Sequence, residues 1–80
     1  MNDTIELISK TIEDIADIPI NEIREDSLII DDLNLSSLEI MSVIAKIEQK
    51  KSIKISESEL LSIRTVGNLA DIINSKIKFV

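Results

Sequence analysis

The spacing of apolar residues near the start of the chain predicts an amphipathic helix. Isoleucines recur there at steps of three and four residues, on one side of a 3.6-residue helix: Ile5, Ile8, Ile12 and Ile15. Asp3, followed three residues later by Glu6, is typical of a helix N-terminus, so we expect Asp3 to cap this helix. The helix should end at Asp17-Ile18-Pro19, because the residue before a proline disfavours the helical conformation.

Residues 18–35 show no sustained period and predict a long loop. We expect apolar side chains to anchor it to the core: Ile20, Ile23, Leu28, Ile29 and Ile30. So long a loop is unusual in a small domain and is often functional.

A second helix is predicted to begin at the serine pair Ser36-Ser37 and to run to about Lys51. Its apolar residues spread over more than half of the circumference: Leu38, Ile40, Met41, Val43, Ile44, Ala45 and Ile47. A helix this apolar is either central in a bundle or carries a patch that faces a partner.

Two more helices are predicted toward the C-terminus. Ser56 and Glu59 form the pattern of a capping box, which one or two helical turns follow, to about Ser62. Thr65 is expected to cap the last helix, whose apolar side holds Val66, Leu69, Ile72, Ile73 and Ile77. Two lysines lie near its C-terminus, where positive charge suits the helix dipole: Lys76 and Lys78.

The chain is rich in isoleucine, so the prediction of helices depends on how the apolar residues are spaced. The chain has 18 isoleucines in 80 residues, and β-branched residues by propensity alone favour strands. Helical spacing overrides that preference, and a single glycine and a single proline argue against many tight turns. The sequence therefore predicts one domain, residues 1–80, that folds as an all-α bundle of three longer helices and one short helix, with the long loop between helices 1 and 2.

Composition excludes several kinds of chemistry. The chain has no histidine and no cysteine, so it lacks the usual zinc ligands, an imidazole base and a thiol of its own. A net charge of −6 and one aromatic residue, Phe79, argue against nucleic acid and favour basic partners. The N-terminus does not resemble a signal peptide, and no apolar stretch approaches the ~20 residues that a membrane helix needs. We expect a cytoplasmic protein that does not insert into membranes.

The residues before the second helix have one feature of a calcium loop. Asp32, Asn34 and Ser36 alternate as the first ligands of an EF-hand do. The sixth position is Ser37 where that loop needs glycine, and the twelfth is Val43 where it needs a bidentate glutamate. We therefore predict no metal site.

The two serines have different expected roles. Ser36 and Glu39 have the spacing of a capping box, with the Ser36 hydroxyl occupied as the helix cap. Ser37 then takes the first helical position, where its hydroxyl has no capping role and an anionic group on it would lie at the positive end of the helix dipole. The residues alone favour Ser37 as the modified serine without saying what it carries. They leave open that both serines only start a helix.

Residues 31–38, Asp-Asp-Leu-Asn-Leu-Ser-Ser-Leu, resemble the signature of the acyl carrier proteins. That signature is an acidic residue and Asp-Leu, then Gly-x-Asp-Ser-Leu at the start of the second helix. Thr65-Val66 falls where the family has the Thr-Val that opens the last helix, and Ile55 falls at the family's isoleucine before the short third helix. The resemblance covers nearly the whole chain and implies an acyl-carrier-like four-helix bundle.

The resemblance implies a carrier and not an enzyme. In this family a phosphopantetheinyl transferase attaches 4′-phosphopantetheine covalently to the motif serine, here Ser37, and the arm bears acyl groups as thioesters for fatty-acid or polyketide-type synthesis. The implied partners are this transferase and the enzymes that load and use the acyl group, and we expect a monomer. By position in the family, four residues should serve partner recognition: Leu38, Glu39, Met41 and Glu48.

The chain also departs from the family pattern. Ser36 replaces the usual Asp before the modified serine, and Asn34 replaces the usual Gly, although Asn tolerates left-handed backbone. Three lysines make the second helix less acidic than is usual in the family: Lys46, Lys50 and Lys51. Lys51 stands where the family often has an aromatic residue. These changes favour a specialised carrier. Two alternatives stay open, a carrier of aminoacyl or peptidyl groups and an unmodified interaction module.

Overall fold

The computed structural model describes residues 3–77 and contains four α-helices and one 3₁₀ turn in that range. The helices are α1 (Asp3–Ala16), α2 (Ser37–Lys51), α3 (Glu57–Ser62) and α4 (Val66–Ile77), and η1 (Ile20–Glu22) lies in the long connection between α1 and α2. Residues 3–77 form no β-strand, only one isolated bridge between Leu28 and Thr65. The predicted all-α fold of three longer helices and one short helix is confirmed.

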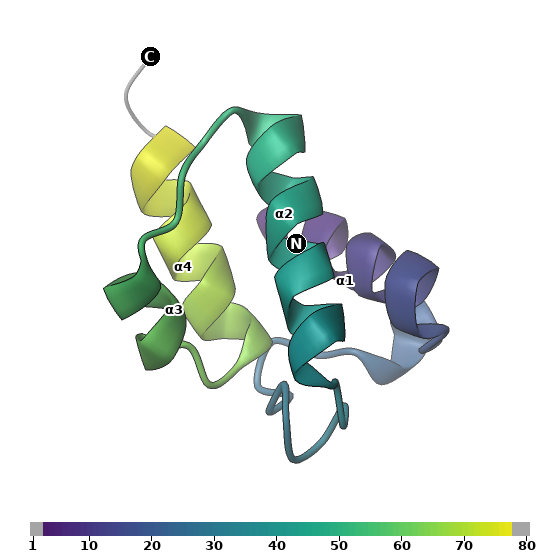
Figure 1. Ribbon diagram of the computed structural model, residues 1–80. Helices are drawn as coiled ribbons and strands as arrows, with labels where there is room; N and C mark the ends of the chain where they lie inside the picture. The colour runs from purple at the N-terminus through teal and green to yellow at the C-terminus, as the bar shows by residue number, and fades with distance from the viewer. Residues whose placement is uncertain (1–2, 78–80) are drawn as a thin grey trace.

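The core lies where α1 packs against α2 and α4 (Figure 1). Apolar residues of α1, α2 and α4 are almost completely removed from solvent: Ile5, Ile8, Ile12, Val43, Ile44, Ile47, Val66, Leu69, Ala70 and Ile73. The spacing predicted most of these positions but not Ala70, and the predicted Ile15, Ile72 and Ile77 are only partly buried. Burial of each isoleucine, leucine or valine of this set stabilises the fold by about 1.5–3 kcal/mol. None of the helices in the described range is long and apolar enough to cross a bilayer.

Three of the turns use left-handed backbone without glycine. Asp17, Asn34 and Ser52 have φ angles of 59°, 55° and 56°. Asp17 ends α1 and Ser52 ends α2, and the N–H of Ser52 bonds back to the carbonyl of Glu48. The prediction that Asn34 supports a left-handed turn in place of the family's glycine is confirmed.

The long loop is partly different from its prediction. Ile23 and Ile29 are buried anchors, but Leu28 is 36% exposed and Ile30 is 64% exposed, so neither anchors the loop to the core. Backbone bonds also tie the loop to the start of α4. The N–H of Val66 donates to the carbonyl of Ser27, and the N–H of Gly67 donates to the carbonyl of Glu25. Burial of Leu28 and Ile30 was the wrong part of the prediction, and Ile20, the remaining predicted anchor, is only half-buried.

Of the caps predicted for α1 and α4, the one at α4 is present. Asp3 is itself a residue of α1, in its first turn, so its prediction as the residue that caps this helix was wrong. At α4 the Thr65 hydroxyl accepts the N–H of Asn68, as expected of its cap. Lys76 lies in the last turn, whereas Lys78 and Phe79 lie outside the described residues.

The short helix α3 is held by polar contacts. The Ser56 hydroxyl accepts the N–H of Glu59, and the Glu59 carboxylate accepts the N–H of Ser56 at 2.8 Å, so the predicted second capping box is present. The Nζ of Lys76 on α4 lies 3.0 Å from the same carboxylate. The backbone hydrogen bond from Ser56 first, and then the bond with Lys76, lower the pKa of Glu59.

Candidate functional site at the start of helix α2

The first turn of α2 is closed by the predicted capping box. The Ser36 hydroxyl accepts the N–H of Glu39 at 3.1 Å, and the Glu39 carboxylate accepts the N–H of Ser36 at 2.8 Å. These two bonds satisfy backbone donors that a helix start leaves without partners. Ser36 is therefore occupied with structure, as its spacing from Glu39 indicated.

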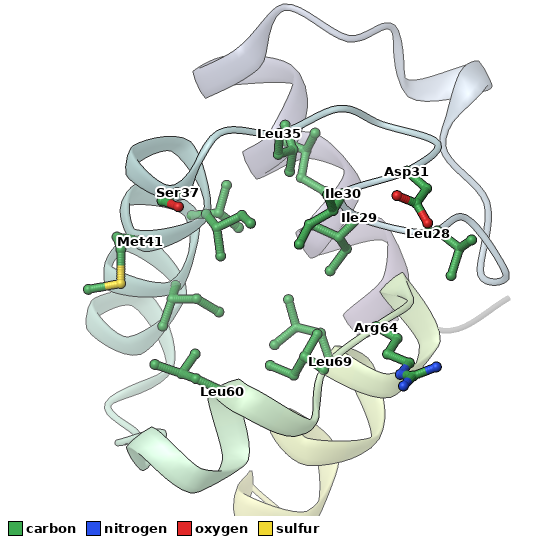
Figure 2. A pocket seen from close by; sticks show the side chains of 15 residues that line it. Leu28, Ile29, Ile30, Asp31, Leu35, Ser37, Met41, Leu60, Arg64 and Leu69 are labelled. Carbon is green, nitrogen blue, oxygen red and sulfur yellow. The ribbon is translucent and has the colours of Figure 1, made fainter.

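Ser37 is the first residue of α2 and is exposed. Its side chain makes no hydrogen bond to any residue in the described range, in contrast to that of Ser36. Figure 2 shows its hydroxyl at the side of a pocket, next to Met41 on the same helix. Ser37 therefore combines a free, accessible hydroxyl with an adjoining cavity.

The pocket has a volume of about 480 Å³ and lies between the start of α2, the end of the long loop, and α3 with the start of α4. Most of the side chains that line it are aliphatic: Ile12, Ile29, Leu35, Ile40, Val43, Ile44, Leu60, Ile63 and Leu69. Figure 2 shows aliphatic side chains from several elements pointing into a common space. Its two charged residues, Asp31 and Arg64, lie on the side opposite Ser37 and Met41. The interior suits an apolar chain, because polar groups placed there would find few hydrogen-bond partners.

Comparison with known proteins decides the family. Residues 6–73 match the family described as "Phosphopantetheine attachment site". The chain is also 35% identical over 78 residues to an acyl carrier protein of Buchnera aphidicola subsp. Schizaphis graminum, which covers 98% of this chain and 99% of that protein. The chain belongs to the acyl carrier protein family.

Other relatives in the acyl carrier protein family agree. An acyl carrier protein of Helicobacter hepaticus is 31% identical over 67 residues, 84% of this chain and 88% of that protein. The meromycolate extension acyl carrier protein of Mycobacterium tuberculosis is 32% identical over 62 residues, which are 78% of this chain and 54% of that longer protein. Acyl carrier proteins are carriers and not enzymes, and the family match implies a covalently attached 4′-phosphopantetheine.

The start of α2 fits such a group. A phosphodiester on the Ser37 oxygen would lie at the positive end of the α2 dipole. The Ser36 hydroxyl already accepts the N–H of Glu39, whereas the Ser37 hydroxyl makes no hydrogen bond to the residues that the structure describes. The apolar pocket beside Ser37 supplies a place for an acyl chain that such an arm would bear.

The four residues expected to serve partner recognition in an acyl carrier protein fall into two pairs. Leu38 is 81% exposed and Met41 is 59% exposed, so neither packs in the core. Glu39 and Glu48 are half-buried, and each accepts a backbone N–H, Glu39 from Ser36 and Glu48 from Ile55 at 2.8 Å. The two apolar side chains are therefore free for a partner, whereas the two carboxylates already hold the fold together.

Sequence reasoning missed several residues around the pocket of this carrier. Leu28, Ile30, Asp31 and Arg64 all line it, and none was assigned to a site. The available signal was the apolar run Leu28-Ile29-Ile30 in a loop without period, which was interpreted as core anchoring. Exposed apolar side chains beside a pocket are better explained as part of its entrance.

Proposed function

We propose that Ser37 carries the 4′-phosphopantetheine arm and that the chain presents acyl thioesters on that arm to the enzymes of a fatty-acid or polyketide-type pathway. The observation that carries the proposal is the free Ser37 hydroxyl between a completed capping box and an apolar pocket. When bound, the arm supplies the thiol that this cysteine-free chain lacks.

The attachment itself needs a transferase. Ser37 has no histidine to act as its base, since the chain contains none. The transferase would take the proton of the Ser37 hydroxyl while the oxygen attacks the phosphate of coenzyme A that bears pantetheine, and adenosine 3′,5′-bisphosphate would leave. The contribution of this chain is to expose the hydroxyl at a fixed helix start and to stabilise the new negative charge by the dipole of α2.

The pocket favours an aliphatic acyl group as cargo over an aminoacyl group. Its interior side chains are isoleucine, leucine and valine, which gain by removing methylene groups from water, about 0.8 kcal/mol for each one buried. The charged ammonium of an aminoacyl group would lose hydration among these side chains, since the carboxylate that lines the pocket, Asp31, lies on the side opposite Ser37. An aminoacyl or peptidyl carrier remains the alternative that a loading experiment must exclude.

Intact mass spectrometry tests the attachment. The apo protein is incubated with coenzyme A, magnesium and a broad-specificity phosphopantetheinyl transferase. We expect a gain of one phosphopantetheine in the wild type and in Ser36→Ala, and none in Ser37→Ala. No gain with any transferase would refute the carrier function in favour of an unmodified interaction module, and loss in Ser36→Ala alone would reverse the roles of the two serines.

Thermal unfolding of loaded protein tests the cargo. We expect an octanoyl thioester on the arm to raise Tm relative to the unacylated arm, because the pocket binds the chain in the folded state only. An alanyl thioester should leave Tm unchanged. Equal stabilisation by both, or by neither, would contradict the proposed role of the pocket.

A further inference from the structure

The outer face of α2 is defined by residues that recur along the whole helix on its exposed side. Beyond Ser37 they are Leu38, Met41, Ser42, Ala45, Lys46, Gln49 and Lys50. The two large apolar residues, Leu38 and Met41, lie at the end near Ser37, and the two charged ones lie toward the other end. This face therefore changes from apolar to basic along its length.

No acidic side chain interrupts the outer face. The carboxylates of α2 are Glu39 and Glu48, both half-buried and bonded to backbone N–H groups. Lys51 is the last residue of the helix, and Lys54 follows it. Within residues 3–77, no ion pair is formed by any of these lysines: Lys46, Lys50, Lys51 and Lys54. The C-terminal end of α2 thus presents unpaired positive charge, although the whole chain has a net charge of −6.

The opposite end of α2 is acidic. The long loop joins α2 there, as Figure 1 shows, and the acidic residues closest in sequence to Ser37 are Asp31 and Asp32. The Asp32 carboxylate accepts the N–H of Leu28 at 2.8 Å. Asp31 is exposed and lines the same pocket as Ser37. The surface around Ser37 is therefore bipolar, with Asp31 on one side of the apolar pair and lysines beyond it on the other.

We infer that the partner enzyme of this carrier docks on the outer face of α2 with a bipolar surface of its own. The surface of the partner enzyme has an apolar pocket for Leu38 and Met41, basic side chains toward Asp31, and acidic side chains opposite Lys46 and Lys50. The lysines lie nine and thirteen residues beyond Ser37, so the acidic side chains of the partner are about 14 and 20 Å along the helix from the modified serine. This inference rests on the proposed function, because the partner must reach Ser37.

Charge complementarity favours this partner over one with a uniformly basic surface. Such a surface would attract the loop but would face unpaired lysines at the other end of α2, and like charges brought together at an interface suppress binding. The repulsion acts mainly on the encounter rate and depends on salt, because the lysines are exposed.

Transfer kinetics test the inference. The probes are coenzyme A, magnesium and two phosphopantetheinyl transferases, one with a carrier-binding surface that is basic throughout and one with acidic side chains at the position that faces the C-terminal end of α2. For the first transferase we expect Lys46→Glu with Lys50→Glu to raise kcat/KM about tenfold or more, mainly through KM. For the second we expect the same pair to lower kcat/KM by a similar factor, and both effects to fade in about 1 M NaCl, where the Debye length is ~3 Å.

Matched variants separate position from net charge and from folding. Lys10→Glu makes the same kind of charge reversal at an exposed site on α1 and should change both rates less than about threefold. Lys46→Gln with Lys50→Gln should shift both rates in the same directions as the Glu pair, by less. Equal rates for wild type and the Glu pair with both transferases would overturn the inference while leaving the proposed function intact.

Two other outcomes would also overturn the inference. If neither transferase modifies the wild type or any variant, the proposed function fails, and the inference fails with it.

A second copy of the chain is the competing occupant of this face, since the acidic and basic ends of two copies would complement each other in an antiparallel pair. Sedimentation of the wild type as a dimer that Lys50→Glu dissociates would overturn the inference in favour of self-association.

Discussion

Replacing Ser36 with alanine should weaken the fold and leave the modification of its neighbour intact. The Ser36 hydroxyl accepts the N–H of Glu39, whereas the Ser37 hydroxyl bonds to no residue in the described range. The substitution Ser36→Ala removes that acceptor and keeps the return bond from the Ser36 N–H to the Glu39 carboxylate. The first turn of α2 therefore loses one of its two capping bonds.

The size of the loss follows from the exposure of the site. Loss of an N-cap hydroxyl costs about 0.5–2 kcal/mol in general. Ser36 is exposed, so water can replace the lost acceptor, and we expect a loss of about 1 kcal/mol in the free energy of unfolding. For a chain of this size that corresponds to a fall in Tm of about 4–8 °C.

Urea unfolding followed by circular dichroism measures this loss. Ser36→Asp should retain the wild-type stability, because aspartate caps as well as serine. Ser37→Ala is the matched control and should change the free energy of unfolding by less than about 0.5 kcal/mol. A loss in Ser37→Ala as large as in Ser36→Ala would refute the division of roles between the two hydroxyls.

Three further predictions concern the scaffold. Glu59→Gln should destabilise the protein above the usual carboxyl pKa of 4.5, because the backbone bond from Ser56 and then Lys76 lower the pKa of Glu59 in the folded state. The difference from wild type in urea unfolding should shrink below pH 4.5 and vanish once the pH has fallen through the lowered pKa of the folded state, and a difference that persists there would contradict this. Gly67→Ala should lower the free energy of unfolding by about 1 kcal/mol, because its Cβ would lie 3.1 Å from the carbonyl oxygen of Glu25; an unchanged urea midpoint would show that the loop moves away freely. Asn34→Val should cost about 1–2 kcal/mol at a left-handed φ of 55° while Asn34→Gly does not, and equal unfolding midpoints would exclude backbone strain there.

The helices and their caps could be predicted because their signals are local. A capping box needs only two residues three positions apart, and both Ser36 with Glu39 and Ser56 with Glu59 form one. Periodic isoleucines identified the buried side of α1 for the same reason.

The loop and the pocket could not be predicted because long-range contacts form them. Ile29 is fixed by a backbone bond from its N–H to the carbonyl of Arg64, 35 residues away in the chain. That pairing buries Ile29 and leaves its neighbours Leu28 and Ile30 exposed, an outcome that no pattern within the loop encodes. The use of Glu48 to hold the N–H of Ile55 was hidden in the same way, since a carboxylate on a helix surface is equally compatible with a partner.

The left-handed turns at Asp17, Asn34 and Ser52 also affect the unfolded chain. Glycine at these positions would relieve strain in the folded protein but would give the unfolded chain more conformations to lose on folding. With a single glycine in 80 residues, this chain has a comparatively stiff unfolded ensemble. Part of the stability of so small a carrier therefore comes from restricting the state that competes with it.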